Sequence, residues 1–220
     1  MQRFETPAPI TAVLEIPAGR IQCIAAGRAD TTVEVRPLNA AKRRDVRAAE
    51  QIEAGYADGV LRIKAPAAKN RILGDSGSVE VTVRLPAGSR VEAKAAAAEF
   101  RGVGRLGDVD VEGANGAVKI DEAASVRLTA FGDVSVGRLD GPARITTQKG
   151  DIRIAEAVRG TVVLTTRTGD VSVGAARGAS ASLDAGTGCG RVRNALENTG
   201  TTDLDIRATT QHGDITATSL

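Results

Sequence analysis

The repeat that decides the fold is clearest in ARITTQKGDIRI, residues 143–154. A Gly-Asp pair stands between two segments in which aliphatic and polar residues alternate, and such alternation is typical of half-buried β-strands. The same pair recurs with similar flanks at Gly132, Gly169 and Gly213, as it does at Gly150. The unit is therefore predicted to be a strand, a Gly-Asp turn and a second strand.

The spacing of the turn glycines predicts how these units are arranged. Successive glycines are separated by 16, 18, 19, 19 and 25 residues, in the order Gly116, Gly132, Gly150, Gly169, Gly188 and Gly213. A period near 19 residues holds two strands of about five residues and two corners. Gly116 and Gly188 are interpreted as degenerate copies, Gly107-Asp108 as a partial copy, and residues 194–201 as an insertion. Stacked parallel coils are expected, because one such unit cannot bury its apolar face alone.

An antiparallel meander is the alternative topology. Asn115-Gly116, flanked by alternating residues, is a strong signal for a β-hairpin. The in-register recurrence of Gly-Asp favours parallel coils, in which corners stack on corners.

The first hundred residues show a different pattern. Alternating runs at 10–16, 21–24, 32–36, 60–64 and 79–85 predict strands, and residues 40–53 predict one short helix with Asn39 as its N-cap. The predicted fold class is all-β. Residues 101–220 are predicted to form a β-solenoid-like stack of two-strand coils with Gly-Asp turns. Residues 1–100 are predicted to form a β-strand region that carries the helix and packs with the stack as one continuous unit.

The composition limits the kinds of partner. Hydrophobic residues make up 42% of the chain but aromatic residues only 2%, so the core must be built from small aliphatic side chains. Lys and Arg number 29 against 27 Asp and Glu, with both signs mixed along the chain, which argues against a nucleic acid partner. No run approaches the ~18 apolar residues of a membrane span, so no membrane partner is expected.

The cysteines and the N-terminus bear on the compartment. Cys23 and Cys189 lack metal-ligand spacing and are interpreted as small buried hydrophobes, with a disulfide between them left open. The polar first nine residues do not resemble an export signal. A cytoplasmic location is therefore expected.

With these motifs in view, the chain resembles the bacterial β-strand-repeat family of proposed adhesins known as domain of unknown function 4097. The resemblance covers nearly the whole chain. It implies a β-solenoid-like fold and no established activity. The motifs on which the resemblance rests are LEIPAG at 14–19, DVRAAEQ at 45–51, VRLPAGS at 83–89, the Gly-Asp repeats at Gly107, Gly132, Gly150 and Gly169, and GRVRN at 190–194.

The turn aspartates are the first candidate site. Asp133, Asp151, Asp170 and Asp214, with Asp108, could form an acidic ladder that binds calcium. One carboxylate per ~19 residues supplies few oxygens for an ion. We therefore assign no metal, and expect each carboxylate to accept hydrogen bonds from backbone amides at the turns.

Three other motifs each have a simpler interpretation. Residues 102–107 match GxGxxG, but a strand rather than a helix is expected to follow, so no dinucleotide cofactor is assigned. His212, the single histidine, occupies the turn position also held by Lys149, and no catalytic triad can be built around it. The basic residues at 42–44 and Arg47 are interpreted as a solvated helix surface that could contact an anionic partner.

A threonine ladder is the last motif. Thr146-Thr147, Thr165-Thr166 and Thr209-Thr210 align in three coils, and Thr129 matches the first of each pair. Such a row could bind a ligand, although threonine is also an ordinary strand residue.

These observations predict a non-enzymatic structural or interaction module, with no catalytic, cofactor or metal residues assigned. Its partner would be an unknown protein or a second copy of the chain. The alternatives are a solenoid enzyme or carbohydrate-binding protein that uses an outward sheet, and a regulatory protein that docks through the basic helix.

Overall fold

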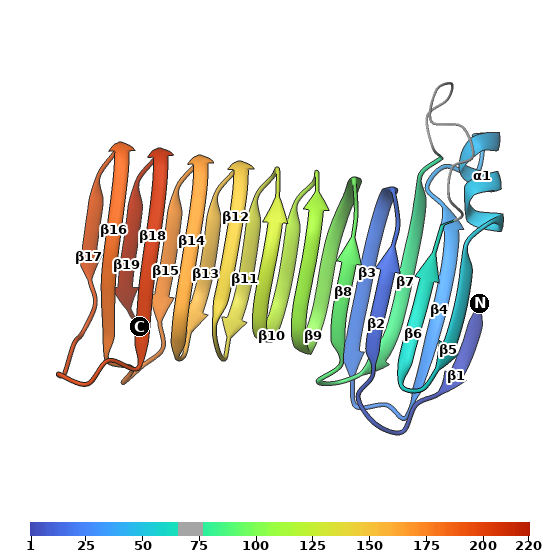
Figure 1. Ribbon diagram of the computed structural model, residues 1–220, viewed down its shortest axis with the longest axis horizontal. Coiled ribbons are helices and arrows are strands. Elements are labelled where there is room, and N and C mark those ends of the chain that lie inside the picture. The colour runs from blue at the N-terminus through green and yellow to red at the C-terminus, as the bar shows by residue number, and fades with distance from the viewer. Residues whose placement is uncertain (66–76) are drawn as a thin grey trace.

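The computed structural model describes residues 1–65 and 77–220, in which the chain forms an elongated β-solenoid (Figure 1). Nineteen strands and one helix account for most of the described residues. The strands of the repeat region pair in parallel, β10 with β12 and β12 with β14, for example. The predicted β-solenoid is confirmed, and the antiparallel meander is wrong for this region.

Each coil contributes one strand to each of two facing sheets. Sheet 1 has the order β5 (Glu53–Ala57), β6 (Val60–Lys64), β2 (Thr11–Glu15), β8 (Arg90–Lys94), β9 (Ala97–Ala114), β10 (Val118–Ala130), β12 (Ala143–Lys149), β14 (Gly160–Thr168), β18 (Leu204–His212) and β16 (Ala181–Cys189). Sheet 2 has the order β1 (Gln2–Glu5), β4 (Asp30–Pro37), β7 (Val79–Pro86), β3 (Ala18–Ala26), β9, β10, β11 (Val134–Leu139), β13 (Ile152–Ala157), β15 (Val171–Ala175), β19 (Ile215–Ser219) and β17 (Val192–Ala195). The long strands β9 and β10 belong to both sheets, because each runs around a corner with a register shift.

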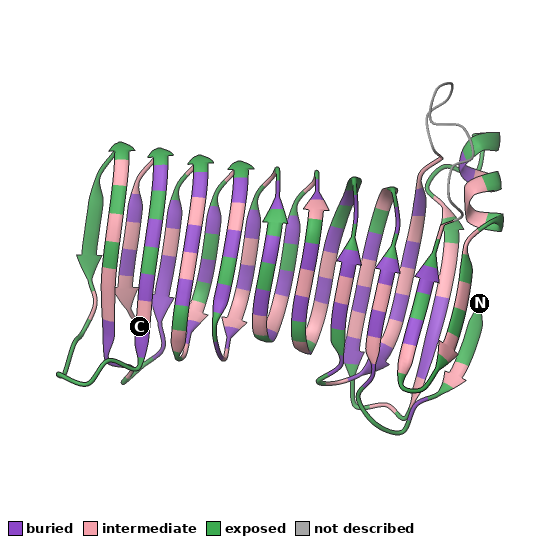
Figure 2. Cartoon of the chain, in the orientation of Figure 1, coloured by how far each residue is buried: buried purple, intermediate pink, exposed green. Residues whose placement is uncertain are grey.

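The core lies between the two sheets and is made of stacked aliphatic rows. Val134, Ile152, Val171 and Ile215 are in register on neighbouring strands and are all buried. Alternate residues such as Arg153 are exposed, so buried and exposed positions alternate along most strands (Figure 2). This confirms the predicted alternation of buried and exposed positions in the repeat.

The last coil of the chain is inserted between two earlier ones. Strand β18 pairs with β14 on one side and β16 on the other, and β19 pairs in the same way with β15 and β17. Residues 196–203 connect β17 to β18, which explains the predicted insertion near 194–201. The coil formed by β16 and β17 therefore stands at the end of the solenoid.

The first coil is inserted too. Strand β2 lies between β6 and β8, and β3 lies between β7 and β9. Beyond them the pairing becomes antiparallel, in β5–β6 and in β1–β4–β7. At this end the rings of Phe4 and Tyr56, one from each sheet, lie 5.9 Å apart and pack against the core.

The helix is shorter than predicted and begins differently. Helix α1 spans Arg43–Glu50, and β5 already starts at Glu53. Asn39 is not its N-cap, because its Oδ1 accepts a hydrogen bond from the Ala41 amide (3.0 Å) in a turn before the helix. Lys42 occupies the N-cap position. The buried Asp45 joins the helix to the sheet, since its Oδ1 accepts from the Ser78 amide (3.0 Å).

Two of the predicted turn positions are wrong. Gly107-Asp108 lies inside β9 rather than at a Gly-Asp corner, since Asp108 is in register with Ser125 of β10. The turn glycine of the coil formed by β16 and β17 is Gly190 rather than Gly188. Gly190 has φ +156° and stacks directly on Gly213.

Replacing Ile152 by Asp tests the stacked core. Ile152 is fully buried, so the variant places an unpaired charge among aliphatic rows and should lose about 4 kcal/mol or more of stability. Arg153→Asp on the same strand points outward and serves as the control. Circular dichroism melts should show a large drop in the midpoint for Ile152→Asp alone. Equal melting of both variants would contradict the inward assignment.

Candidate functional site

The turn aspartates form a ladder of hydrogen bonds between coils. The carboxylate of Asp133 accepts from the Asp151 amide (2.9 Å), that of Asp151 from the Asp170 amide (2.8 Å), and that of Asp170 from the Asp214 amide (2.7 Å). Asp214 in turn accepts from the amide of Arg191 (2.9 Å). Each carboxylate therefore bonds a backbone amide of the neighbouring coil rather than one in its own turn.

Threonine hydroxyls complete the same corner from inside, where Thr147, Thr166 and Thr210 are buried and Thr187 is half-buried. In each pair of neighbouring coils, a threonine hydroxyl donates to the carbonyl of the adjacent turn glycine. The bonds are Thr147 to Gly132 (2.8 Å), Thr166 to Gly150 (3.1 Å), Thr210 to Gly169 (3.0 Å) and Thr187 to Gly213 (2.9 Å). The second threonine of each predicted pair thus has a structural role, because its hydroxyl satisfies a turn carbonyl.

The ladder ends at Arg191, which stands where the other turns have an aspartate. Its Nη2 lies 2.9 Å from Asp214 Oδ2. The hydrogen bond from the Arg191 amide, followed by the one from its guanidinium, lowers the pKa of Asp214 below the ordinary carboxyl value. Because Arg191 has no carboxylate, the coil formed by β16 and β17 cannot accept the amide hydrogen bond that a further coil at this end would donate.

The outer surface of sheet 1 has two contrasting rows of charge. In one row the signs alternate and the side chains pair, as in Lys64 to Glu15 (3.3 Å) and Lys94 to Glu112 (3.4 Å). The row beside it, which we call the charged row, contains Glu92, Asp110, Arg127 and Arg144 in register on β8, β9, β10 and β12. Here two acids are followed by two bases.

Three of these four side chains have no polar partner among the described residues. Glu92 is bonded to Arg90 (2.9 Å), but the side chains of Asp110, Arg127 and Arg144 form no hydrogen bond or ion pair with any described residue. Like charges directly opposite on neighbouring strands destabilise a sheet. Two of the three neighbouring pairs in the charged row, Glu92 with Asp110 and Arg127 with Arg144, therefore oppose the stability of the sheet, while Asp110 and Arg127 bring opposite charges side by side. Such a departure from local consistency is expected at functional sites.

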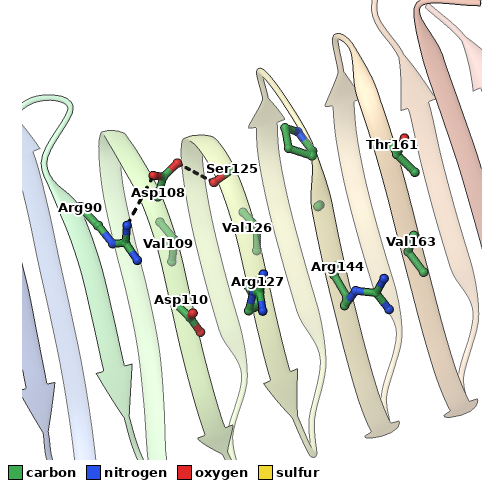
Figure 3. A pocket seen from close by; sticks show the side chains of 12 residues that line it. Arg90, Asp108, Val109, Asp110, Ser125, Val126, Arg127, Arg144, Thr161 and Val163 are labelled. Carbon is green, nitrogen blue, oxygen red and sulfur yellow. Dashed lines mark hydrogen bonds and ion pairs between the residues drawn. The ribbon is translucent and has the colours of Figure 1, made fainter.

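A shallow depression of about 420 Å³ lies along the same strands (Figure 3). At one end the Ser125 hydroxyl donates to Asp108 (2.6 Å), and the Asp108 carboxylate lies 4.0 Å from the Arg90 guanidinium. Arg127 and Arg144 stand on adjacent strands nearby. The depression is lined by Arg90, Asp108, Val109, Asp110, Ser125, Val126, Arg127, Pro142, Ala143, Arg144, Thr161 and Val163. This surface can bind a charged, polar partner through groups of both signs.

The outward threonine row borders the charged row. Thr129, Thr146, Thr165 and Thr209 are in register on four strands, as predicted, and the Thr209 hydroxyl donates to that of Thr165 (3.2 Å). The row ends at Gly186 on β16. It adds neutral hydroxyls to the surface beside the arginines.

The other predicted motifs lie elsewhere. GxGxxG falls within β9, so no helix follows it. His212 is in register with Thr168 and Cys189 at the corner, as predicted for a turn position. On helix α1, Arg43 and Arg47 are exposed while Asp45 points into the protein.

Cofactor, metal and membrane features can be judged for the described part of the chain. There, no three His, Cys, Asp or Glu side chains come together in a group that could hold a metal ion. The four turn aspartates remain separate rungs of one ladder. Over residues 1–65 and 77–220, no helix has the length and apolar character needed to cross a membrane.

Both cysteines are free, and only one of them is buried. Burial raises the pKa of the Cys23 thiol to about 12. Cys189 is exposed at the end of β16, contrary to its interpretation as a buried hydrophobe. The terminal coil has a neighbour on one side only, so its side chains are less covered than those of inner coils.

The charged row was missed at the sequence level. Its signal was present, because the Gly-Asp period aligns Arg127 with Arg144, both at outward positions. Glu92 lies before the predicted repeat, and Asp110 lies in its irregular first part, next to the partial copy at Gly107-Asp108. Their place in the row depends on the pairing of β8 with β9, which the sequence pattern does not specify.

The fold and these surfaces define a β-solenoid with structural corners and a charged, flat outer sheet. The chain belongs to the Toastrack DUF4097 family, whose family model matches residues 11–218. No curated protein matches the chain.

Several solved structures are similar to this chain along nearly its whole length. A proposed adhesin from Bacteroides fragilis NCTC 9343 has 12% identity and a TM-score of 0.48, with 98% of this chain and 95% of that one covered. A proposed adhesin from Parabacteroides merdae ATCC 43184 has 12% identity and a TM-score of 0.47, with 97% and 94% covered. A proposed cell adhesion protein from Clostridium sporogenes ATCC 15579 has 12% identity and a TM-score of 0.41, with 100% and 98% covered.

Replacing Gly169 by Ala tests the corner. Gly169 has φ +145°, and a Cβ there would lie 2.1 Å from the carbonyl oxygen of Gly150, so the stacked corners would have to separate. We expect a loss of about 1–3 kcal/mol. Gly186→Ala is the control, since a Cβ at Gly186 meets no atom within 4 Å. Urea denaturation would contradict the tight corner if both variants unfolded at the same midpoint.

Asp214 should make stability depend on pH at the end of the ladder. Because its folded pKa is lowered, its contribution is complete above the ordinary value of 3.8 and is lost as the pH falls below that value toward the folded pKa. Thermal melts over an acid series should show this loss reduced in Asp214→Asn. Asp184→Asn, on the exposed surface of β16, should retain it. Identical acid profiles for all three proteins would contradict a linked role for Asp214.

Proposed function

We propose that this protein is a non-enzymatic interaction module that binds a protein partner through the outer surface of sheet 1. The observation that carries the proposal is the charged row, where Asp110, Arg127 and Arg144 lie side by side without partners in the described chain. Elsewhere on this surface Lys64 and Lys94 are paired with acids. An external partner of complementary charge would satisfy the three unpaired groups.

The shape of the surface supports binding by a partner over catalysis. The depression is shallow and lies along the sheet (Figure 3). The Ser125 hydroxyl donates to Asp108, and the single histidine, His212, lies at the corner of β18. Salt-sensitive recognition through charged side chains fits this arrangement, because such groups give specificity and fast association.

The two free thiols support a cytoplasmic location as part of this proposal. Cys189 is exposed, and an exposed free thiol persists in a reducing compartment. Fractionation of the native cells, with the chain followed by antibody, tests the assignment. Recovery outside the cytoplasmic fraction would contradict it.

Changing the two arginines tests the binding surface. The variant Arg127→Glu/Arg144→Glu reverses half of the charged row without touching the core, since both side chains are exposed. Immobilised wild-type chain, incubated with native lysate, should retain a protein that this variant loses. The control is Arg153→Glu, an exposed arginine of sheet 2. Retention of the same proteins by all three chains would exclude sheet 1 as the binding surface.

A further inference from the structure

We propose that the partner of sheet 1 is a second copy of this chain, docked face to face about a two-fold axis that runs parallel to the strands between β9 and β10. This inference rests on the proposed function, since it names the partner of the same surface. Two-fold dimers use one patch on both copies, so the patch must be complementary to itself.

The order of charges makes the surface self-complementary. Across β8, β9, β10 and β12 the charged row reads Glu92, Asp110, Arg127, Arg144. Rotation about an axis between β9 and β10 reverses this order in the second copy. Arg127 of one copy then faces Asp110 of the other, and Arg144 faces Glu92. A two-fold axis across the strands would instead bring each charge onto its own kind.

The next strands outward fit the same axis. Val13 of β2 and Val163 of β14 extend the charged row on its two sides, and both are half-buried apolar residues. The rotation places Val13 of one copy on Val163 of the other. The six central positions of the row thus become four ion pairs flanked by two apolar contacts.

The two neighbouring rows bring no like charges together. In one, the charged residues of β2, β8 and β9 face the threonine row of the second copy, so that Glu112 meets Thr129 and Lys94 meets Thr146. In the other row Asp108 meets Ser125. Like charges first meet at the rim, in the contact that brings together Arg62 and Arg207. There Arg207 is already bonded to Asp205 of its own chain (3.1 Å).

The area of this surface indicates a weak dimer. Six strands spaced about 4.8 Å apart and three rows of outward residues cover roughly 600 Å² on each copy. About 1,200 Å² in total is the lower end of the range for stable protein interfaces. Because much of the contact is between exposed charges, association should weaken as salt screens them.

Charge reversal tests the dimer, because a second reversal on the facing residue should restore the association that the first one weakens. Sedimentation velocity on the purified chain should show a dimer that dissociates as NaCl is raised. Arg144→Glu alone and Glu92→Arg alone each place like charges opposite one another twice per dimer, and each should weaken association by about tenfold or more. The double variant Glu92→Arg/Arg144→Glu restores opposite signs and should recover dimerisation.

A cross-link supplies a second measurement. In a Cys189→Ser background, Val13→Cys/Val163→Cys should form a disulfide-linked dimer under mild oxidation, whereas Val13→Cys alone should not. A monomer at every concentration and salt, failure of the double reversal to recover dimerisation, or absence of the cross-link would overturn self-pairing. If the wild-type chain is monomeric while Arg127→Glu/Arg144→Glu still loses a protein from lysate, self-pairing is wrong and the proposed function stands.

Discussion

The hydrogen bonds that pass between coils at each Gly-Asp corner are the constraint on which the solenoid depends. The turn carboxylate accepts from the next amide, and a buried threonine donates to the previous glycine carbonyl, as Asp151 and Thr166 do at one corner. Both bonds need the corners to be directly above one another. Glycine is required there because a Cβ at Gly169 would meet the backbone of the coil below. Strand register, and with it the separation of inward from outward residues, follows from this stacking.

Because the strand register is fixed, the order of outward residues in the sequence determines the pattern of side chains on the outer surface. Because each outward residue lies beside the equivalent residue of the next coil, charges can be set in order across strands, as in the row from Glu92 to Arg144. Two of the three neighbouring pairs in this row, Glu92 with Asp110 and Arg127 with Arg144, have like charges, which oppose the stability of the sheet. The core and the corners hold the fold, which leaves the outer surface free for the association proposed above.

The repeat was accessible from sequence because its signals are local. Alternation predicted which residues face inward, and Gly-Asp predicted the corners at Gly132, Gly150, Gly169 and Gly213. The predictions were wrong at positions whose structure is determined by tertiary contacts. Gly190 rather than Gly188 forms the last corner because it stacks on Gly213, a coil that follows it in the chain. Asn39 fails as a cap because its own turn uses its side chain.

The division of the chain at residue 100 stays a prediction, although β9 runs continuously through that point. For the candidate site, the sequence predicted the outward threonine row but not the charged row. Assembling the latter requires β8 to lie beside β9, and β2 beside β8, an order that alternation of residues does not encode. Helix α1 illustrates the same limit, since no sequence motif indicated that Asp45 is buried and accepts a hydrogen bond from the Ser78 amide.

The inserted position of β18 and β19 has a consequence for how the molecule is made. Strands β18 and β19 follow β16 and β17 in the chain, yet they lie between the coil of β14 and β15 and the coil of β16 and β17. The strands β16 and β17 therefore have no pairing partner in the stack until β18 and β19 have folded against β14 and β15. Removing the final twenty residues would delete an internal coil and leave the one beyond it detached.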